Sequence, residues 1–122
     1  MMLNAGVAMV PFKLVHGVES QLFINHVAHH YLTSLLLHKL KDSCPSRVVV
    51  VSSDAHEFAS NGITLEPPLS DKYSGWGCYC NSKLANVHFT TALAKRLAQH
   101  RVYVNAVHPG AVNTNIPSKG GV

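Results

Sequence analysis

The chain has 122 residues, of which 47% are hydrophobic and 13% charged, and it carries a formal net charge of +4. This length suits one domain with a single core, and the composition is that of a folded chain and not a disordered one. The basic residues are scattered and form no basic run, which disfavours nucleic-acid binding.

Cysteine content and apolar runs bear on the compartment. The three cysteines, Cys44, Cys78 and Cys80, match neither a disulfide framework nor a Cys-x-x-Cys zinc site, so we expect a reducing compartment. No apolar run approaches the ~20 residues that a membrane span needs. We therefore expect a cytoplasmic location, and membrane association of a longer parent protein stays open.

The first third of the chain predicts a short strand and a long helix. Residues 1–3 are apolar and run into Asn4-Ala5-Gly6, which is typical of a strand that ends at a turn. From about 17 to 41 the apolar residues recur at helical spacing, and Pro45 lies just beyond them. These residues are Val18, Leu22, Val27, Tyr31, Leu35 and Leu36.

The remainder predicts strand, loop, helix and strand. Residues 47–51 read Arg-Val-Val-Val-Val, typical of a strand that is buried on both faces of a parallel sheet. We expect a loop over 54–76, a helix over 77–99 and a strand over 102–107. The order strand–helix–strand–helix–strand predicts an α/β fold with a parallel sheet, and right-handed crossovers place both helices on one face.

Tyr79 and Lys83 are the first candidate catalytic pair. Residues four apart share one helical face, and a lysine ammonium there lowers the pKa of a neighbouring phenol, which makes tyrosine a usable acid or base. Ser52-Ser53 closes the preceding strand and points a hydroxyl toward the same region. The pair alone is a weak signal, because Tyr-x-x-x-Lys is usually a solvated helix face.

Catalytic groups in parallel sheets gather beyond the carboxyl ends of the strands. Five short motifs fall there or on the flanking helices, in one order, and together they resemble the short-chain dehydrogenase/reductase family. They are Asn4-Ala5-Gly6; Asn25; Ser53; Tyr79-x-x-Ser82-Lys83; and Pro109-Gly110-x-Val112-x-Thr114. The residues around these motifs are most similar to those of the branch that holds the retinol dehydrogenases and the WW-domain-containing oxidoreductase.

The resemblance implies a mechanism and a site. Tyr79 is the acid or base, Lys83 lowers its pKa, Ser53 hydrogen-bonds the substrate oxygen, and Asn25 anchors a water that links Lys83 to solvent. The implied substrate is a lipophilic alcohol or carbonyl compound. The implied cofactor is NAD or NADP, and the residues that choose between them are absent from this chain. The residues implied to bind it are Asn4, Ala5, Gly6, Tyr79, Lys83, Pro109, Gly110, Val112 and Thr114.

Simpler interpretations stand beside each of these. Ser53 alone is more often a turn residue, Asn25 a buried polar residue that satisfies nearby backbone, and Pro109-Gly110 an ordinary turn. His26, His29 and His30 share a helix face, but no carboxylate or thiolate lies at a matching interval, so a metal site is disfavoured.

The family's glycine-rich phosphate-binding turn is absent. We therefore interpret residues 1–122 as the catalytic-half segment of a Rossmann-like doubly wound domain that is truncated at both ends. We expect it to be inactive and marginally stable alone, because one sheet face is uncovered. The rival interpretation is a catalytically inactive isoform that forms a homo- or heterodimer, for instance with a full-length relative, through the two long helices.

Overall fold

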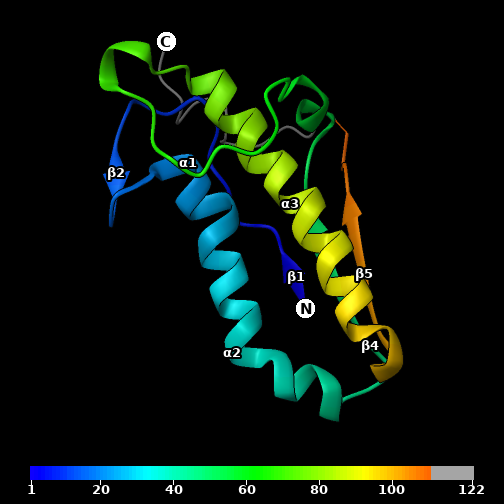
Figure 1. Ribbon diagram of the computed structural model, residues 1–122. Coiled ribbons are helices and arrows are strands. Elements are labelled where there is room, and N and C mark those ends of the chain that lie inside the picture. The colour runs from blue at the N-terminus through cyan, green and yellow to red at the C-terminus, as the bar shows by residue number, and fades with distance from the viewer. Residues whose placement is uncertain (111–122) are drawn as a thin grey trace.

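The computed structural model describes residues 1–110, which form a three-stranded parallel sheet and two long helices (Figure 1). The strands β1 (Met2–Leu3), β4 (Ser46–Val51) and β5 (Val102–Val107) lie in the order β1-β4-β5. The helix α2 (Ala28–Asp42) connects the first pair and α3 (Gly75–Leu97) the second. The predicted α/β fold with a parallel sheet is confirmed.

The core lies between the sheet and the helices. β4 and β5 pair in register, with Val48 opposite Val104 and Val50 opposite Ala106. Side chains alternate between faces along a strand, so one face presents every second residue to α2 and α3. The buried residues of the core are Leu3, Leu40, Val48, Val50, Leu93, Leu97, Val102 and Val104.

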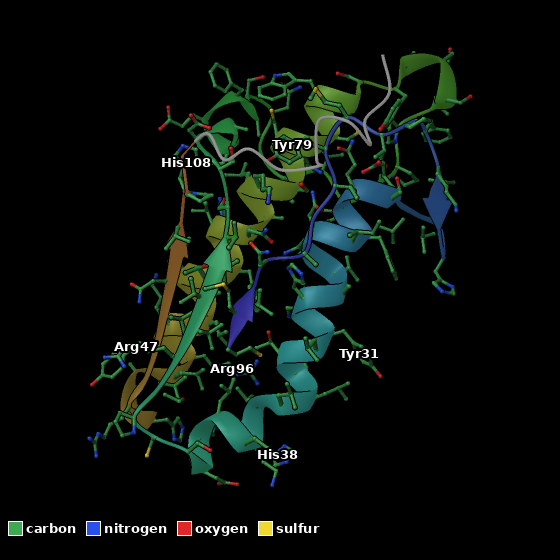
Figure 2. All side chains as sticks on the ribbon, turned by 180° about the vertical axis from the view of Figure 1, so that it is seen from behind. Tyr31, His38, Arg47, Tyr79, Arg96 and His108 are labelled. Carbon is green, nitrogen blue, oxygen red and sulfur yellow. The ribbon has the colours of Figure 1, made fainter. Side chains whose placement is uncertain are left out.

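The opposite face of the sheet is only partly covered. Figure 2, seen from behind, shows β4 and β5 in front of α3, with Arg47 at the outer side of the strands. Arg47 lies over the ring of Tyr103, 5.6 Å from the ring centroid, and Tyr103 is 50% exposed. Val49 and Val51 are half-buried. As expected, both helices lie on one face of the sheet, and within the described residues the other face of β4 lacks the helical cover that its β-branched run is typical of.

The first helix begins three residues later than predicted. A small hairpin of β2 (Leu14–Val15) and β3 (Val18–Glu19) precedes it. His16 and Gly17 have φ values of 50° and 79°, and positive φ at both central residues is the requirement of a tight type I′ hairpin turn. Glu19 then caps α1 (Ser20–Leu22), because its carboxylate accepts from the backbone N–H groups of Gln21 and Leu22.

The remaining boundaries follow from local capping. The π-helical turn η1 (Phe23–Val27) joins α1 to α2, and α3 begins two residues before the predicted start because the Ser74 hydroxyl accepts from Gly77 N–H at 3.1 Å. The expected loop contains two short 3-10 helices, η2 (Asp54–Phe58) and η3 (Ser70–Lys72), and η4 (Ala98–His100) extends α3. None of the helices in residues 1–110 combines the length and apolar character of a membrane span.

Candidate functional site

The candidate site lies at the carboxyl edge of the sheet. Because the three strands are parallel, their ends at Leu3, Val51 and Val107 meet at the same edge. The first turns of α3 return to this edge, and Figure 2 shows Tyr79 and His108 at the same end of the strands. The edge therefore brings together four separate stretches of sequence, namely the ends of the three strands and the first turns of α3.

Lys83 is a buried ammonium, with only 6% of the residue exposed. Its Nζ donates to the Val51 carbonyl at 3.1 Å and lies over the Tyr79 ring, 5.5 Å from the centroid. Both contacts stabilise a cation, but burial disfavours the charged form and lowers the pKa of Lys83 to about 8. At neutral pH the group is still mostly protonated.

Tyr79 is half-buried beside Lys83, and its phenol pKa is raised, chiefly by burial, while a hydrogen bond with the Ser53 side chain lowers it. The expected net lowering of this pKa is therefore not found in this structure, where burial has the larger effect. The ammonium contacts the ring face and a carbonyl, and the loss of hydration at the phenol outweighs the favourable contacts. Tyr79 is consequently held as a neutral proton donor.

The two serines that end β4 have different partners. Ser52 is buried, and its hydroxyl donates to the Lys83 carbonyl at 2.9 Å, which ties α3 to the strand end. Ser53 caps η2: it accepts from Ala55 N–H at 3.2 Å and donates to Asp54 Oδ1 at 2.9 Å. Ser53 is thus the serine that lies toward the Tyr79 phenol. Its hydroxyl can donate to another acceptor only after its hydrogen bond to Asp54 is broken.

Asn25 is fully buried in the π-helical turn. Its amide oxygen accepts from Val7 N–H at 2.8 Å, and its amide nitrogen donates to the Val7 carbonyl at 2.9 Å and to Ser82 Oγ at 3.0 Å. Ser82 Oγ in turn donates to the Tyr79 carbonyl at 2.7 Å. Asn25 is therefore joined to the Tyr79 turn through Ser82, and its role as a water anchor stays a prediction.

The expected cofactor-binding residues flank this edge. Asn4 and Ala5 are exposed after β1, and Gly6 approaches Asn25 so closely that an added Cβ would stand 3.1 Å from Asn25 Oδ1. Pro109 and Gly110 are exposed after β5, and Gly110 has a φ of 78°, which favours glycine. Val112 and Thr114 lie outside the described residues.

A second polar network, which no sequence motif predicted, lies beside the site. Gln21, fully buried, accepts from Met9 N–H at 2.7 Å and donates to the Tyr73 hydroxyl at 3.0 Å and the Gly75 carbonyl at 2.9 Å. The Tyr73 hydroxyl donates to the Val10 carbonyl at 2.6 Å. This network fixes the start of α3 against the segment after β1, and its members lie too far apart in sequence for a spacing rule to find them.

The histidines of the first long helix do not assemble a metal site within the described residues. His26 Nδ1 lies 3.2 Å from Asn86 Oδ1, and burial, above all, lowers the pKa of His26. The pKa of His29 is also lowered by burial, and its Nδ1 has no hydrogen-bond partner within the described chain. At neutral pH these rings are mainly uncharged and pack between α2 and α3.

Known proteins with similar sequences share this segment. The family model for short chain dehydrogenases matches residues 69–120. Retinol dehydrogenase 12 from human is 50% identical over 115 residues, and the bovine protein of that name is 48% identical over 115; each alignment covers 93% of this chain and 36% of the relative. Human retinol dehydrogenase 13 is 42% identical over 120 residues. The chain spans about a third of the length of the curated relatives it matches.

Solved structures share the fold. A protein from Mycobacterium paratuberculosis described as uncharacterized is 41% identical with a TM-score of 0.73, and the match covers 98% of this chain and 44% of that one. A short-chain dehydrogenase from Sphingobium yanoikuyae in complex with NADPH has a TM-score of 0.74 at 21% identity, covering 99% and 43%. The second likeness concerns the fold alone.

Proposed function

Because the chain belongs to the short-chain dehydrogenase/reductase family and is retinol dehydrogenase-like in sequence, we propose that it supplies the acid/base part of an NAD(P)-dependent oxidoreductase. The reaction is the interconversion of an alcohol and a carbonyl compound. One observation carries the proposal: a buried Lys83 lies over the ring of Tyr79 at the carboxyl edge of the sheet, and the Ser53 side chain is close enough to the same phenol to lower its pKa.

In the reducing direction the carbonyl oxygen gains one proton and the carbonyl carbon gains one hydride. The nicotinamide supplies the hydride when it is bound. Tyr79 donates the phenol proton, for which its raised pKa suits it as an acid at neutral pH. Ser53, once turned from Asp54, donates a hydrogen bond to the developing oxyanion, and the Lys83 ammonium stabilises the phenolate that Tyr79 leaves.

A lipophilic substrate fits the surroundings of Tyr79. Trp76 lies 6.0 Å from Tyr79 between ring centroids and is 46% exposed, and Phe58 lies 6.0 Å from Trp76 and is 66% exposed. Phe58 and Trp76 form an exposed aromatic surface next to the Tyr79 ring, here called the aromatic ledge. The relatives named retinol dehydrogenase support a long apolar alcohol as its ligand.

A chimera tests the proposal. The matching 115-residue segment of human retinol dehydrogenase 12 is replaced by this chain, and retinol-dependent reduction of NADP is measured. We expect the chimera to turn over and its Tyr79→Phe variant to lose activity roughly 10²–10⁴-fold, the range for a general acid/base. Tyr103→Phe, at a 50% exposed tyrosine on β5, is the matched control and retains activity. Equal activities of the two variants would contradict the proposal.

We further propose that α2 pairs with a second chain of this family. Tyr31, Leu32, Leu35 and Leu36 are exposed by 38 to 65%, and Figure 2 shows Tyr31 pointing away from the strands. An exposed apolar stripe on one helix suits packing against another. Light scattering after size-exclusion chromatography should show a dimer that Leu35→Glu dissociates, and an unchanged mass would refute this.

A further inference from the structure

A cavity of about 400 Å³ lies beside the first turns of α3, away from Lys83. Its walls include Cys78 and Asn81 of α3, Glu19 before α1, and the segment 58–68. Asn81 stands two residues from both Tyr79 and Lys83, which is about 200° around the helix axis from each. The cavity therefore belongs to a different side of the helix from the acid/base pair.

One side chain holds the outer wall of this cavity in place. Asn81 Oδ1 accepts from Thr64 N–H at 2.8 Å, and Asn81 Nδ2 donates to the Thr64 carbonyl at 2.6 Å. The paired bonds clamp the loop to the helix as a strand partner would, and Pro67-Pro68 stiffens the loop beyond the clamp. The volume of this open cavity lies in the range of small-molecule sites.

The lining combines apolar walls with negative charge. Leu22, Phe58 and the two prolines provide the apolar surface, and Glu19 and Glu66 are its ionisable carboxylates. No lysine, arginine or histidine is among the described residues that line it. Residues 54–72 hold four of the six acidic residues of a chain with net charge +4, namely Asp54, Glu57, Glu66 and Asp71, against one lysine.

Glu19 gives the cavity its buried charge, because the residue is only 3% exposed. Its carboxylate accepts hydrogen bonds from Gln21 N–H, Leu22 N–H and Ser20 Oγ, all near 3 Å. No basic side chain of the described residues forms an ion pair with it. These donors satisfy the carboxylate oxygens but leave its charge without a cationic partner among the described residues, so a cationic group in the cavity would be attracted to it.

Cys78 adds no opposing charge. Burial and the nearby Glu19 raise the pKa of its thiol to about 11. The thiol is therefore neutral at pH 7 and is a poor nucleophile, because the thiolate is the reactive form. The cavity is suited to reversible binding and not to covalent chemistry.

We propose that this cavity is a binding site for small primary amines with an apolar body, separate from the acid/base site. The ammonium pairs with the buried carboxylate of Glu19, the more exposed Glu66 adds to the negative potential, and the body packs on Phe58 and Leu22. The site goes beyond the oxidoreductase function, since neither Tyr79 nor Lys83 lines it; Phe58 is the one residue that it shares with the aromatic ledge.

The single tryptophan of the chain reports occupancy, because Trp76 packs 6.0 Å from the cavity residue Phe58. Hexylamine, 1-hexanol and hexanoate are titrated against the 122-residue chain at pH 7. Hexylamine should change the fluorescence and bind at least about tenfold more tightly than hexanol, since a charge-assisted hydrogen bond is roughly twice as strong as a neutral one. Hexanoate should bind more weakly than either.

Variants locate the ligand. Glu66→Gln, at an exposed position, should weaken hexylamine binding about threefold and leave hexanol unchanged, and Glu19→Gln should weaken it at least tenfold. Glu57→Gln, outside the cavity, is the matched control. A second readout needs no fluorescence: at pH 9, where more of the thiol is ionised than at pH 7, hexylamine should slow modification of Cys78 by methyl methanethiosulfonate and leave the exposed Cys44 unprotected. Equal affinity for hexylamine and hexanol, or no protection of Cys78, would overturn the proposal.

Discussion

The two sides of α3 differ in how their polar side chains are held. On the side that faces the sheet and α2, Ser82, Lys83 and Asn86 are buried, and each contacts a fixed partner on another element. On the other side, Asn81 lines a cavity whose outer wall is the loop over 58–68. The side of α3 that packs on the sheet holds its polar groups in a precise geometry. The side that faces the loop can change the shape of the cavity and the ligand that it binds.

The free energy of unfolding of single variants tests this difference, because removing a polar side chain destabilises the fold most where its hydrogen-bond partners are buried. The variants below disturb first the packed side and then the cavity side. Equal effects on both sides would break the comparison.

Asn25→Ala should have the largest effect. It leaves the N–H and carbonyl of Val7 and the Ser82 hydroxyl without the partner that now satisfies them. We expect the free energy of unfolding to fall by about 3 kcal/mol, because each buried unsatisfied group costs ~1–3 kcal/mol. Urea denaturation followed by circular dichroism measures this, and a loss below about 1 kcal/mol would show that the packed side is not rigid.

The pH dependence of Lys83 should come next. Its folded pKa of about 8 lies below the ordinary 10.5, so between these values the unfolded chain binds more protons and stability rises with pH. Relative to Lys83→Met, the chain should gain about 2 kcal/mol between pH 8 and pH 10. Cys78 has the opposite effect, because its pKa is raised in the folded chain and the stability that it contributes falls as the pH rises above the thiol pKa of the unfolded chain. Both proteins contain Cys78, so this contribution cancels when the two free energies of unfolding are subtracted. A constant difference across that interval would mean that Lys83 is hydrated.

Asn81→Ala should have the smallest effect on stability. It removes two hydrogen bonds to Thr64 in an exposed loop, where water replaces the lost partner. We expect a loss of about 1 kcal/mol or less in the free energy of unfolding. Trypsin cleavage after Lys72, however, should be faster as the loop loosens. An unchanged cleavage rate would show that Asn81 does not hold the cavity wall.

Local sequence patterns predicted the framework of the fold. The β-branched run before Ser52 and the alternation in 102–107 identified two of the paired strands, since such side chains suit a pleated, half-buried surface. The start of the first helix was missed because Val18 fits both a helix and a two-residue strand. The His16-Gly17 turn was the available signal for the hairpin.

Only the site residues that belong to a sequence motif could be predicted. Tyr79, Lys83 and Ser53 were found by pattern, and the structure places them at one edge of the sheet. The Gln21 network and the clamp of Asn81 on Thr64 join residues 12 to 63 positions apart. Such contacts depend on the folded arrangement and on burial, which spacing does not encode. The raised pKa of Tyr79 likewise follows from burial.

The central claim is that Lys83 is a buried ammonium held against Tyr79 on the packed side of α3. Nuclear magnetic resonance of 13Cε-labelled lysine in the chain tests it, with the Lys83 signal assigned by its loss in Lys83→Arg. The account predicts a titration midpoint of about 8 and a chemical shift that changes when the ring current is altered in Tyr79→Leu. A Lys83 signal that titrates above 10 and ignores Tyr79→Leu would contradict it.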